Sequence, residues 1–150
     1  MRLVIQRVSK AAVHIGGVCA GAVGPGLLIL AGIEEEDTEE GVRWLGDGAG
    51  AMRSCAEADG KMNLSVREVS GSVLVVSQFT LHASTRKGNR PSFIRAARPE
   101  RAIPLYELFK KELASLLEGR VESGEFGADM QVSLVNDGPV TIFMDSRNRE

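Results

Sequence analysis

Residues that build most catalytic and metal centres are scarce in this chain. It has two histidines and two cysteines, and aromatic residues make up 5% of its 150 positions. Cys19 and Cys55 stand far apart, with no CxxC pair and no companion histidine, which argues against a zinc site and predicts unpaired thiols. We therefore expect neither a metal ion nor another cofactor.

Long apolar runs and common catalytic motifs are missing as well. The longest run, Leu27 to Ile33 with Gly32 inside it, is far shorter than the ~20 residues that cross a bilayer. Residues 1–7 become polar again before a signal peptide could form, so we expect a cytoplasmic protein. Nucleophile elbows, Walker loops, HExxH pairs and dinucleotide-binding glycine fingerprints are all absent.

The net charge of −2 hides an uneven distribution. Six acids lie between Glu34 and Glu40, and six basic residues stand against a single acid between Arg86 and Arg101. Phosphate is a natural partner for such a basic segment. The segment can equally be a solvated loop whose charges serve only solubility, and composition leaves both interpretations open.

Apolar residues in alternating or continuous runs predict several strands. They cover residues 2–9, 12–23, 27–33, 72–81, 130–135 and 140–144. Gly16 and Gly17 predict a hairpin turn, and the continuous run 27–33 predicts a strand buried on both faces. The last two strands are joined by Asn136-Asp137-Gly138-Pro139, which has the composition of a tight turn.

Two helices are expected. Asp37 followed by Glu40 is typical of a helix N-cap, and apolar residues then recur at helical spacing through residues 38–53. Three glycines oppose this helix, since each costs up to about 1 kcal/mol relative to alanine; they are Gly46, Gly48 and Gly50. A second helix begins at Pro99-Glu100 and is ended by Gly119.

These elements predict one mixed α/β domain of the α+β type that spans residues 1–150. Strands outnumber helices and several are joined by hairpins, so we expect a curved, largely antiparallel, barrel-like sheet with two helices packed on it. Residues 146–150 are expected to form a flexible tail.

Polar residues interrupt the clearest strand near its end. The interruption consists of Ser77, Gln78, Phe79 and Thr80. Burying hydroxyls and an amide there costs free energy unless something hydrogen-bonds them. A ligand or backbone carbonyls can do so, and the residues alone leave both possibilities open. If the strand continues through this point, period-two alternation places His82 on the same face as Thr80.

Five segments carry a more specific signal because they occur together and in order. They are Ser77-Gln78-Phe79-Thr80-Leu81, Arg86-Lys87-Gly88, Arg90-Pro91-Ser92-Phe93, Gly127-Ala128-Asp129-Met130 and Asn136-Asp137-Gly138-Pro139-Val140-Thr141. With Ile5-Gln6-Arg7-Val8 and residues 60–65, they closely resemble the D-aminoacyl-tRNA deacylase family from Met1 to about Asp145. The chain departs from the family at residues 46–50 and 54–56, where relatives tend to carry bulkier residues.

The resemblance implies a homodimer that hydrolyses the ester bond of D-aminoacyl-tRNA. It implies that the Gly138-Pro139 peptide bond is cis and that its loop crosses the dimer interface into the partner's active site. Two carbonyl oxygens there would accept hydrogen bonds from the substrate ammonium and leave no room for an L side chain. Glycine has no side chain to exclude, so glycyl-tRNA is implied as a second substrate.

The resemblance also implies roles for individual residues. The terminal adenosine and the ester would be held by Ser77, Gln78, Phe79 and Thr80, and the adenine pocket would be lined by Phe126 and Met130. Asn136 would belong to the substrate-binding loop. The acceptor-stem phosphates would contact Arg86, Lys87 and Arg90. Either Thr80 attacks the ester, or it positions groups while the ribose 2′-hydroxyl assists water. The second is favoured, because a threonine hydroxyl without a base is a weak nucleophile, and strand-end N–H groups would stabilise the oxyanion.

Two other functions stay open from the residues alone. A hydrolase of another small ester could use the same hydroxyls without RNA, and it would turn over free D-amino-acid esters independently of salt. A non-catalytic RNA-binding module could use the basic loop and Phe93, although stacking platforms need more aromatics than this chain has. Such a module would bind tRNA without deacylating D-tyrosyl-tRNA.

Overall fold

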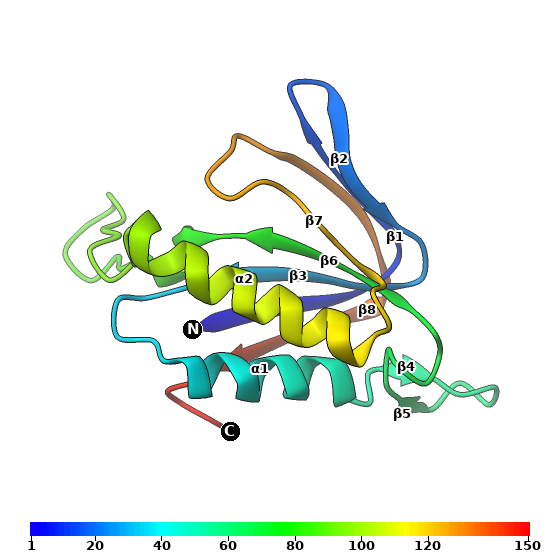
Figure 1. The fold of residues 1–150 in the computed structure, drawn as a ribbon. Helices are drawn as coiled ribbons and strands as arrows, with labels where there is room; N and C mark the ends of the chain where they lie inside the picture. The colour runs from blue at the N-terminus through cyan, green and yellow to red at the C-terminus, as the bar shows by residue number, and fades with distance from the viewer.

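One long strand organises the sheet. In the computed structural model, which describes residues 1–150, β1 (Arg2–Ile15) pairs antiparallel with β2 (Val18–Val23), β3 (Gly26–Gly32) and β8 (Gln131–Asp145). The strands β2 and β3 pair with separate halves of β1, whereas β8 follows nearly its whole length. The hairpin of β1 and β2 projects from the rest of the molecule (Figure 1).

A parallel part completes the curved sheet. The strand β3 pairs with β6 (Ser72–Ser77), and β6 pairs with β7 (Val121–Ser123), both in parallel. The edges β2 and β7 approach each other closely, because a Cβ atom at Gly21 would lie 3.1 Å from the Ser123 carbonyl oxygen. The predicted barrel-like sheet is confirmed, with two parallel pairs among its antiparallel ones.

Two helices, α1 (Glu39–Ala51) and α2 (Pro99–Leu116), pack side by side on one face of the sheet (Figure 1). Twenty buried residues form the main core, to which the two helices and the sheet contribute, and seven more form a second core within the sheet. The strand β3 serves both cores, since Leu27 and Ile29 belong to the first and Leu28 to the second. The prediction of a strand buried on both faces is confirmed.

The start of α1 differs from the prediction. Thr38, and not Asp37, is the N-cap, and its hydroxyl accepts a hydrogen bond from the Gly41 N–H at 3.2 Å. The Asp37 carboxylate is buried, where it accepts hydrogen bonds from the Met1 ammonium and from the Glu34 N–H. Asp37 therefore joins the first residues of the chain to the segment after β3.

Two glycines of α1, Gly46 and Gly50, face the second helix. A Cβ atom at Gly46 would lie 3.1 Å from Glu112 Cβ, and one at Gly50 would lie 3.1 Å from Leu116 Cδ1. The helix forms despite its low intrinsic propensity because these missing side chains let α1 and α2 approach closely, so that tertiary packing compensates for the glycines.

Residues 136–139 do not join two antiparallel strands, contrary to the prediction. The strand β8 continues along β1 on both sides of them, with Asn136 opposite Val8 and Thr141 opposite Gln6. The residues in between therefore bulge out of an otherwise continuous pairing. Turn-type composition suits such a bulge as well as it suits a hairpin.

Other differences concern the lengths of elements. The strand predicted over 72–81 ends at Ser77, and the 3₁₀ turn η1 (Phe79–His82) follows it. The strands predicted over 2–9 and 12–23 are not separate at their junction. The strand β1 continues through Lys10 without a break and includes the first residues of the second predicted strand. Three short strands were not predicted: β7, β4 (Cys55–Ala56) and β5 (Met62–Leu64), the last two of which form a small hairpin.

The end of the chain returns to the start of α1. Arg147 forms ion pairs with Glu34 and Glu36, and Arg149 pairs with Glu40. These contacts do not test whether residues 146–150 are flexible, so their flexibility stays a prediction. None of the helices combines the length and the apolar character required to cross a membrane.

The close approach of the helices predicts the effect of enlarging Gly46. Gly46→Leu should lower the free energy of unfolding by about 1–3 kcal/mol, because the new side chain must force α1 from α2. Chemical denaturation measures this, with Asp47→Leu, which adds the same side chain at an exposed position, as the control. Equal stability of the two variants would contradict the packing described here.

Candidate active site

The end of β6 carries the polar residues that the sequence singled out. The Gln78 N–H donates to the Ala31 carbonyl at 2.8 Å, which extends the pairing of β6 with β3. The chain then turns into η1, where the Leu81 N–H donates to the Gln78 carbonyl at 3.2 Å. Phe79 and Thr80 begin this turn, so their N–H groups have no acceptor within it.

Thr80 is exposed on the turn. Its hydroxyl accepts a hydrogen bond from the Gln78 side-chain amide, and no acid, histidine or lysine hydrogen-bonds to it. His82 is buried, with 1% of its surface exposed. The prediction that these two side chains share a face is wrong, because a 3₁₀ turn rotates successive residues by about 120°.

A cavity of about 230 Å³ opens beside the turn. Ser77, Gln78 and Phe79 line it together with Phe126 and Met130, which follow β7 in the sequence. Most of its lining residues are apolar, and the polar groups belong to the end of β6. The structure thus brings together the residues predicted from two distant segments, in a pocket that suits a flat ring with a polar extension.

The aromatic wall of the cavity is supported from α2. The rings of Tyr106 and Phe126 lie 5.7 Å apart at 59°, and the Tyr106 hydroxyl donates to the Val75 carbonyl at 3.2 Å. Burial raises the pKa of the Tyr106 phenol, and the Glu107 carboxylate adds to the effect. Tyr106 therefore stays a neutral donor that ties α2 to β6 beside the cavity.

Gly138 and Pro139 do not line this cavity. Both are exposed, and the peptide bond between them is cis. Asn136 holds the bulge, because its side-chain oxygen accepts from the Val140 N–H at 2.8 Å and its amide donates to the Val140 carbonyl at 3.3 Å. The structure therefore separates these three residues from the strand-end residues of the same chain.

Arg7, in β1, holds the bulge, and sequence reasoning did not assign it this role. Its Nε donates to the Asp137 carbonyl at 2.8 Å, and its Nη1 donates to the Ser54 carbonyl at 2.9 Å. A Cβ atom at residue 138 would lie 3.1 Å from Arg7 Nη2, and Gly138 has a φ of +142°. Arg7 thus fixes the bulge at a point where glycine is required. The sequence feature that could have identified Arg7 is its place in the Ile5-Gln6-Arg7-Val8 segment, which belongs to the family resemblance.

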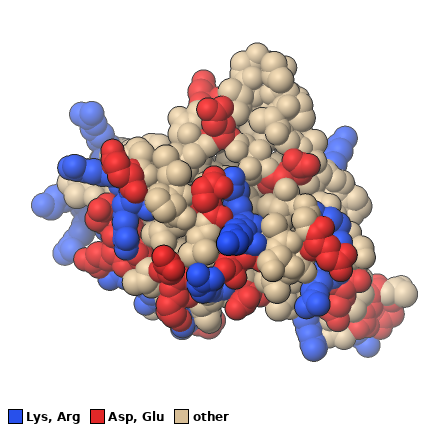
Figure 2. Space-filling model, in the orientation of Figure 1, with Lys and Arg blue, Asp and Glu red and all other residues tan.

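The basic segment after η1 forms a loop. Ser84 and Ser92 close it, each N–H donating to the other's carbonyl at 2.8 and 2.9 Å. Its exposed cations form no ion pairs; they are Arg86, Lys87 and Arg90. Figure 2 shows basic side chains projecting at the left of the molecule, where Figure 1 places this loop. These charges are free to meet an anionic partner.

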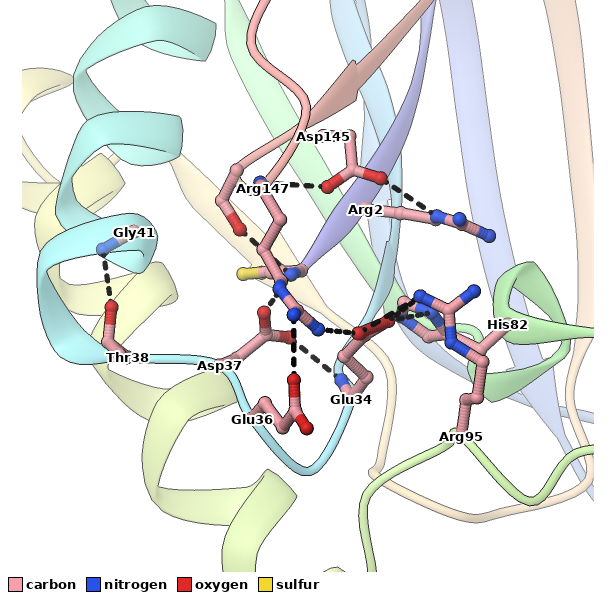
Figure 3. Close-up of polar contacts among 12 residues, drawn as sticks. Arg2, Glu34, Glu36, Asp37, Thr38, Gly41, His82, Arg95, Asp145 and Arg147 are labelled. Carbon is pink, nitrogen blue, oxygen red and sulfur yellow. Dashed lines mark hydrogen bonds and ion pairs between the residues drawn. The ribbon is translucent and has the colours of Figure 1, made fainter.

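A cluster of charged side chains around the buried Glu34 reaches the same turn (Figure 3). Glu34, just beyond β3, is 4% exposed. Its carboxylate accepts hydrogen bonds from Arg95 Nη2 at 2.8 and 3.1 Å and from Arg147 Nη1, and it lies 3.1 Å from His82 Nδ1. Sequence reasoning counted Glu34 only as one member of an acidic block. Its position directly after a buried strand was the signal that could have identified it.

The environment fixes the charge states in this cluster. Burial opposes ionisation of Glu34, but Arg95 and Arg147 outweigh it and hold the pKa of the carboxyl below its usual value. Burial lowers the pKa of the His82 imidazole and outweighs the opposing effects of the Gly32 backbone and the Glu34 charge. At neutral pH Glu34 is therefore charged and His82 neutral. Neither ring nitrogen of His82 makes a well-aligned hydrogen bond.

Known proteins resemble this chain over its whole length. It is 92% identical over 150 residues to a D-aminoacyl-tRNA deacylase of Akkermansia muciniphila and 55% identical to one of Bacteroides fragilis, with 100% of each chain covered in both cases. Among solved structures, a c-Myc DNA Unwinding Element Binding Protein has a TM-score of 0.92 at 37% identity, covering 97% of this chain and 98% of that one.

A second solved structure, a probable eukaryotic D-amino acid tRNA deacylase, shares the fold. Its TM-score is 0.82 at 16% identity, over 95% of this chain and 97% of that one. The sequence profile of the D-Tyr-tRNA(Tyr) deacylase family matches residues 4–145. The chain therefore belongs to the D-Tyr-tRNA(Tyr) deacylase family.

Proposed function

We propose that this protein hydrolyses the ester that joins a D-amino acid to the 3′ end of a tRNA, releasing the free amino acid and the tRNA. The observation that carries the proposal is the turn after β6. The Phe79 and Thr80 N–H groups have no acceptor within this turn, which also carries the Thr80 hydroxyl, and Phe79 lines the apolar cavity. Family membership supplies the substrate class.

The cavity takes the terminal adenosine in this proposal. Phe126 and Met130 give the adenine ring an apolar wall, and Tyr106 keeps Phe126 in place. Ser77 and Gln78 line the same cavity and offer polar groups to the ribose. The ester then lies at the turn, because it is attached to that ribose.

Hydrolysis needs stabilisation of the oxyanion that forms when water attacks the ester carbonyl. The Phe79 and Thr80 N–H groups are preorganised donors for it, and such donors contribute about 3–4 kcal/mol to the lowering of a barrier. Thr80 orients groups in this scheme, and the ribose 2′-hydroxyl of the substrate assists the water. The absence of a base hydrogen-bonded to Thr80 supports this choice over attack by the threonine itself.

Selection for the D configuration is assigned to the bulge of β8. Gly138 and Pro139 are exposed and do not line the cavity of their own chain, so they can act on a substrate only in a second copy. Their carbonyl oxygens would accept from the substrate ammonium and crowd out an L side chain. Glycyl-tRNA would escape this exclusion and be a second substrate.

A homodimer with its active sites at the subunit interface follows from that assignment. One edge of β8 pairs with β1, and no strand pairs with its other edge. Large apolar side chains are exposed along β8, namely Leu134, Val135 and Phe143. A two-fold dimer covers such a surface with its own copy and exchanges the two bulges reciprocally.

The basic loop is assigned to the acceptor stem. Arg86, Lys87 and Arg90 are exposed, form no ion pair, and follow the turn by a few residues. Contacts of this kind to phosphates add affinity without reading sequence. Because the substrate is an aminoacyl-tRNA of the translation machinery, we place the enzyme in the cytoplasm.

The proposed reaction predicts a stereochemical preference. Purified protein should release D-tyrosine from D-tyrosyl-tRNA about 100-fold faster or more than L-tyrosine from L-tyrosyl-tRNA. Gly138→Ala, prepared in parallel, should lose most of this activity, because the added methyl group meets Val140 and Arg7. Preferential cleavage of the L ester, or equal rates on both, would contradict the proposed function.

The role of Thr80 predicts a modest effect of its removal. Thr80→Ala should lower kcat by about tenfold, as expected for the loss of one orienting hydrogen bond. Removal of a nucleophile instead costs on the order of 10⁶ in kcat. Single-turnover hydrolysis of D-tyrosyl-tRNA measures the difference, with Thr80→Ser as the variant that keeps the hydroxyl. Complete loss in Thr80→Ala with intact folding and binding would favour the nucleophile mechanism.

A further inference from the structure

The turn η1 packs directly on the end of β3. A Cβ atom at Gly32 would lie 2.8 Å from the Gln78 carbonyl oxygen, 3.0 Å from Leu81 Cβ and 3.2 Å from His82 Cδ2. Glycine is therefore required at this point for the two segments to touch. Its backbone fixes how near the turn lies to β3, but not how the turn is rotated about its own axis.

His82 is placed to set that rotation. In a 3₁₀ turn, residues two apart point about 240° from each other, so inward burial of His82 leaves Thr80 outward. His82 is 1% exposed, whereas Thr80 is exposed. The polar side chain within reach of the imidazole is Glu34, whose Oε2 lies 3.1 Å from Nδ1. This separation is within hydrogen-bond range.

Glu34 is itself held from several sides, as Figure 3 shows. The Glu34 backbone N–H donates to Asp37 Oδ2 at 2.8 Å, and Glu34 pairs with Ala96 in an isolated β-bridge. Arg95 and Arg147 bind the carboxylate. An unpaired buried charge is expensive, so these guanidiniums keep the carboxylate ionised and restrict it to accepting hydrogen bonds. A neutral His82 with its proton on Nδ1 can donate to this carboxylate.

We propose that Glu34 and His82 are a positioning pair for the hydrolysis. The Glu34 carboxylate accepts the Nδ1–H of His82 and thereby fixes the rotation of η1, which aims the Thr80 hydroxyl and the N–H groups of Phe79 and Thr80 at the ester. Neither residue of the pair touches the substrate. This inference rests on the proposed function, since it concerns how the same turn is held.

The test compares two replacements of His82. His82→Asn puts an amide N–H where Nδ1 lies, whereas His82→Leu fills similar space without a donor. With D-tyrosyl-tRNA, His82→Leu should lower kcat about tenfold, the value expected for loss of one hydrogen bond. His82→Asn should restore kcat to within about threefold of the wild type. Binding of an amide-linked D-tyrosyl-adenosine analogue, measured by calorimetry, should stay the same in all three proteins.

The second arm changes the acceptor. Glu34→Met, which removes the acceptor oxygens, should lower kcat about as much as His82→Leu does, and the double variant should lose no more than either single variant, because both remove the same interaction. Glu36→Met is the matched control, since Glu36 is exposed and pairs with Arg147 but does not contact His82. Its kcat should equal that of the wild type.

Several results would overturn the inference. Full kcat in folded His82→Leu and Glu34→Met, equal losses in His82→Asn and His82→Leu, or losses confined to KM would show that the pair is only a structural contact. If His82→Leu does not fold, Glu34→Met with its control decides alone. A wild-type protein without turnover would overturn the proposed function, and this inference with it, before any variant is compared.

Discussion

The parallel pairing of β3 with β6 is the constraint on which the rest of the site depends. Ala31 lies opposite Ser77, so both strands end at the same edge of the sheet. The segments that follow, η1 after β6 and the Glu34 segment after β3, are therefore forced to be neighbours. A slip of one residue would exchange the two faces of β6 and place Val73 and Val75 in the wrong core, which makes this register costly to change.

The residues of the proposed site lie in two separate parts of the subunit. The cavity and the turn stand on buried strands and on α2, which hold donors in fixed directions. The bulge of β8 stands apart, anchored by Arg7 and Asn136. In the proposed dimer each subunit contributes a turn with a cavity to one site and a bulge to the other, so chemistry and stereochemical selection come from different chains.

Much of the fold could be predicted from local patterns. The buried strand over 27–33, the helices and the polar end of β6 follow from hydrophobic periodicity and capping chemistry. The Asn136-Pro139 bulge could not, because its composition suits a hairpin equally, and only pairing with the distant β1 keeps β8 continuous. The 3₁₀ turn was missed for a similar reason, since Phe79 and Leu81 continue the alternation of the strand.

The candidate site could be predicted as a set of residues, but not as an arrangement. The motifs identified the strand end, the bulge and the basic loop. Only the three-dimensional structure shows that the strand end lines a cavity while the exposed bulge lies away from it. Glu34 and Arg7 were not singled out, because a charged residue in a charged or polar stretch resembles a solvated one. Contacts with segments far away in the sequence give both of them their roles.

A crystal structure of the protein with an amide-linked D-tyrosyl-adenosine analogue tests the central claim most directly. The account predicts the adenine ring in the cavity against Phe126 and the amide carbonyl oxygen about 3 Å from the Phe79 and Thr80 N–H groups. It also predicts the partner subunit's Gly138 beside the ammonium group. An analogue bound away from the end of β6, or with its carbonyl turned from η1, would contradict the account.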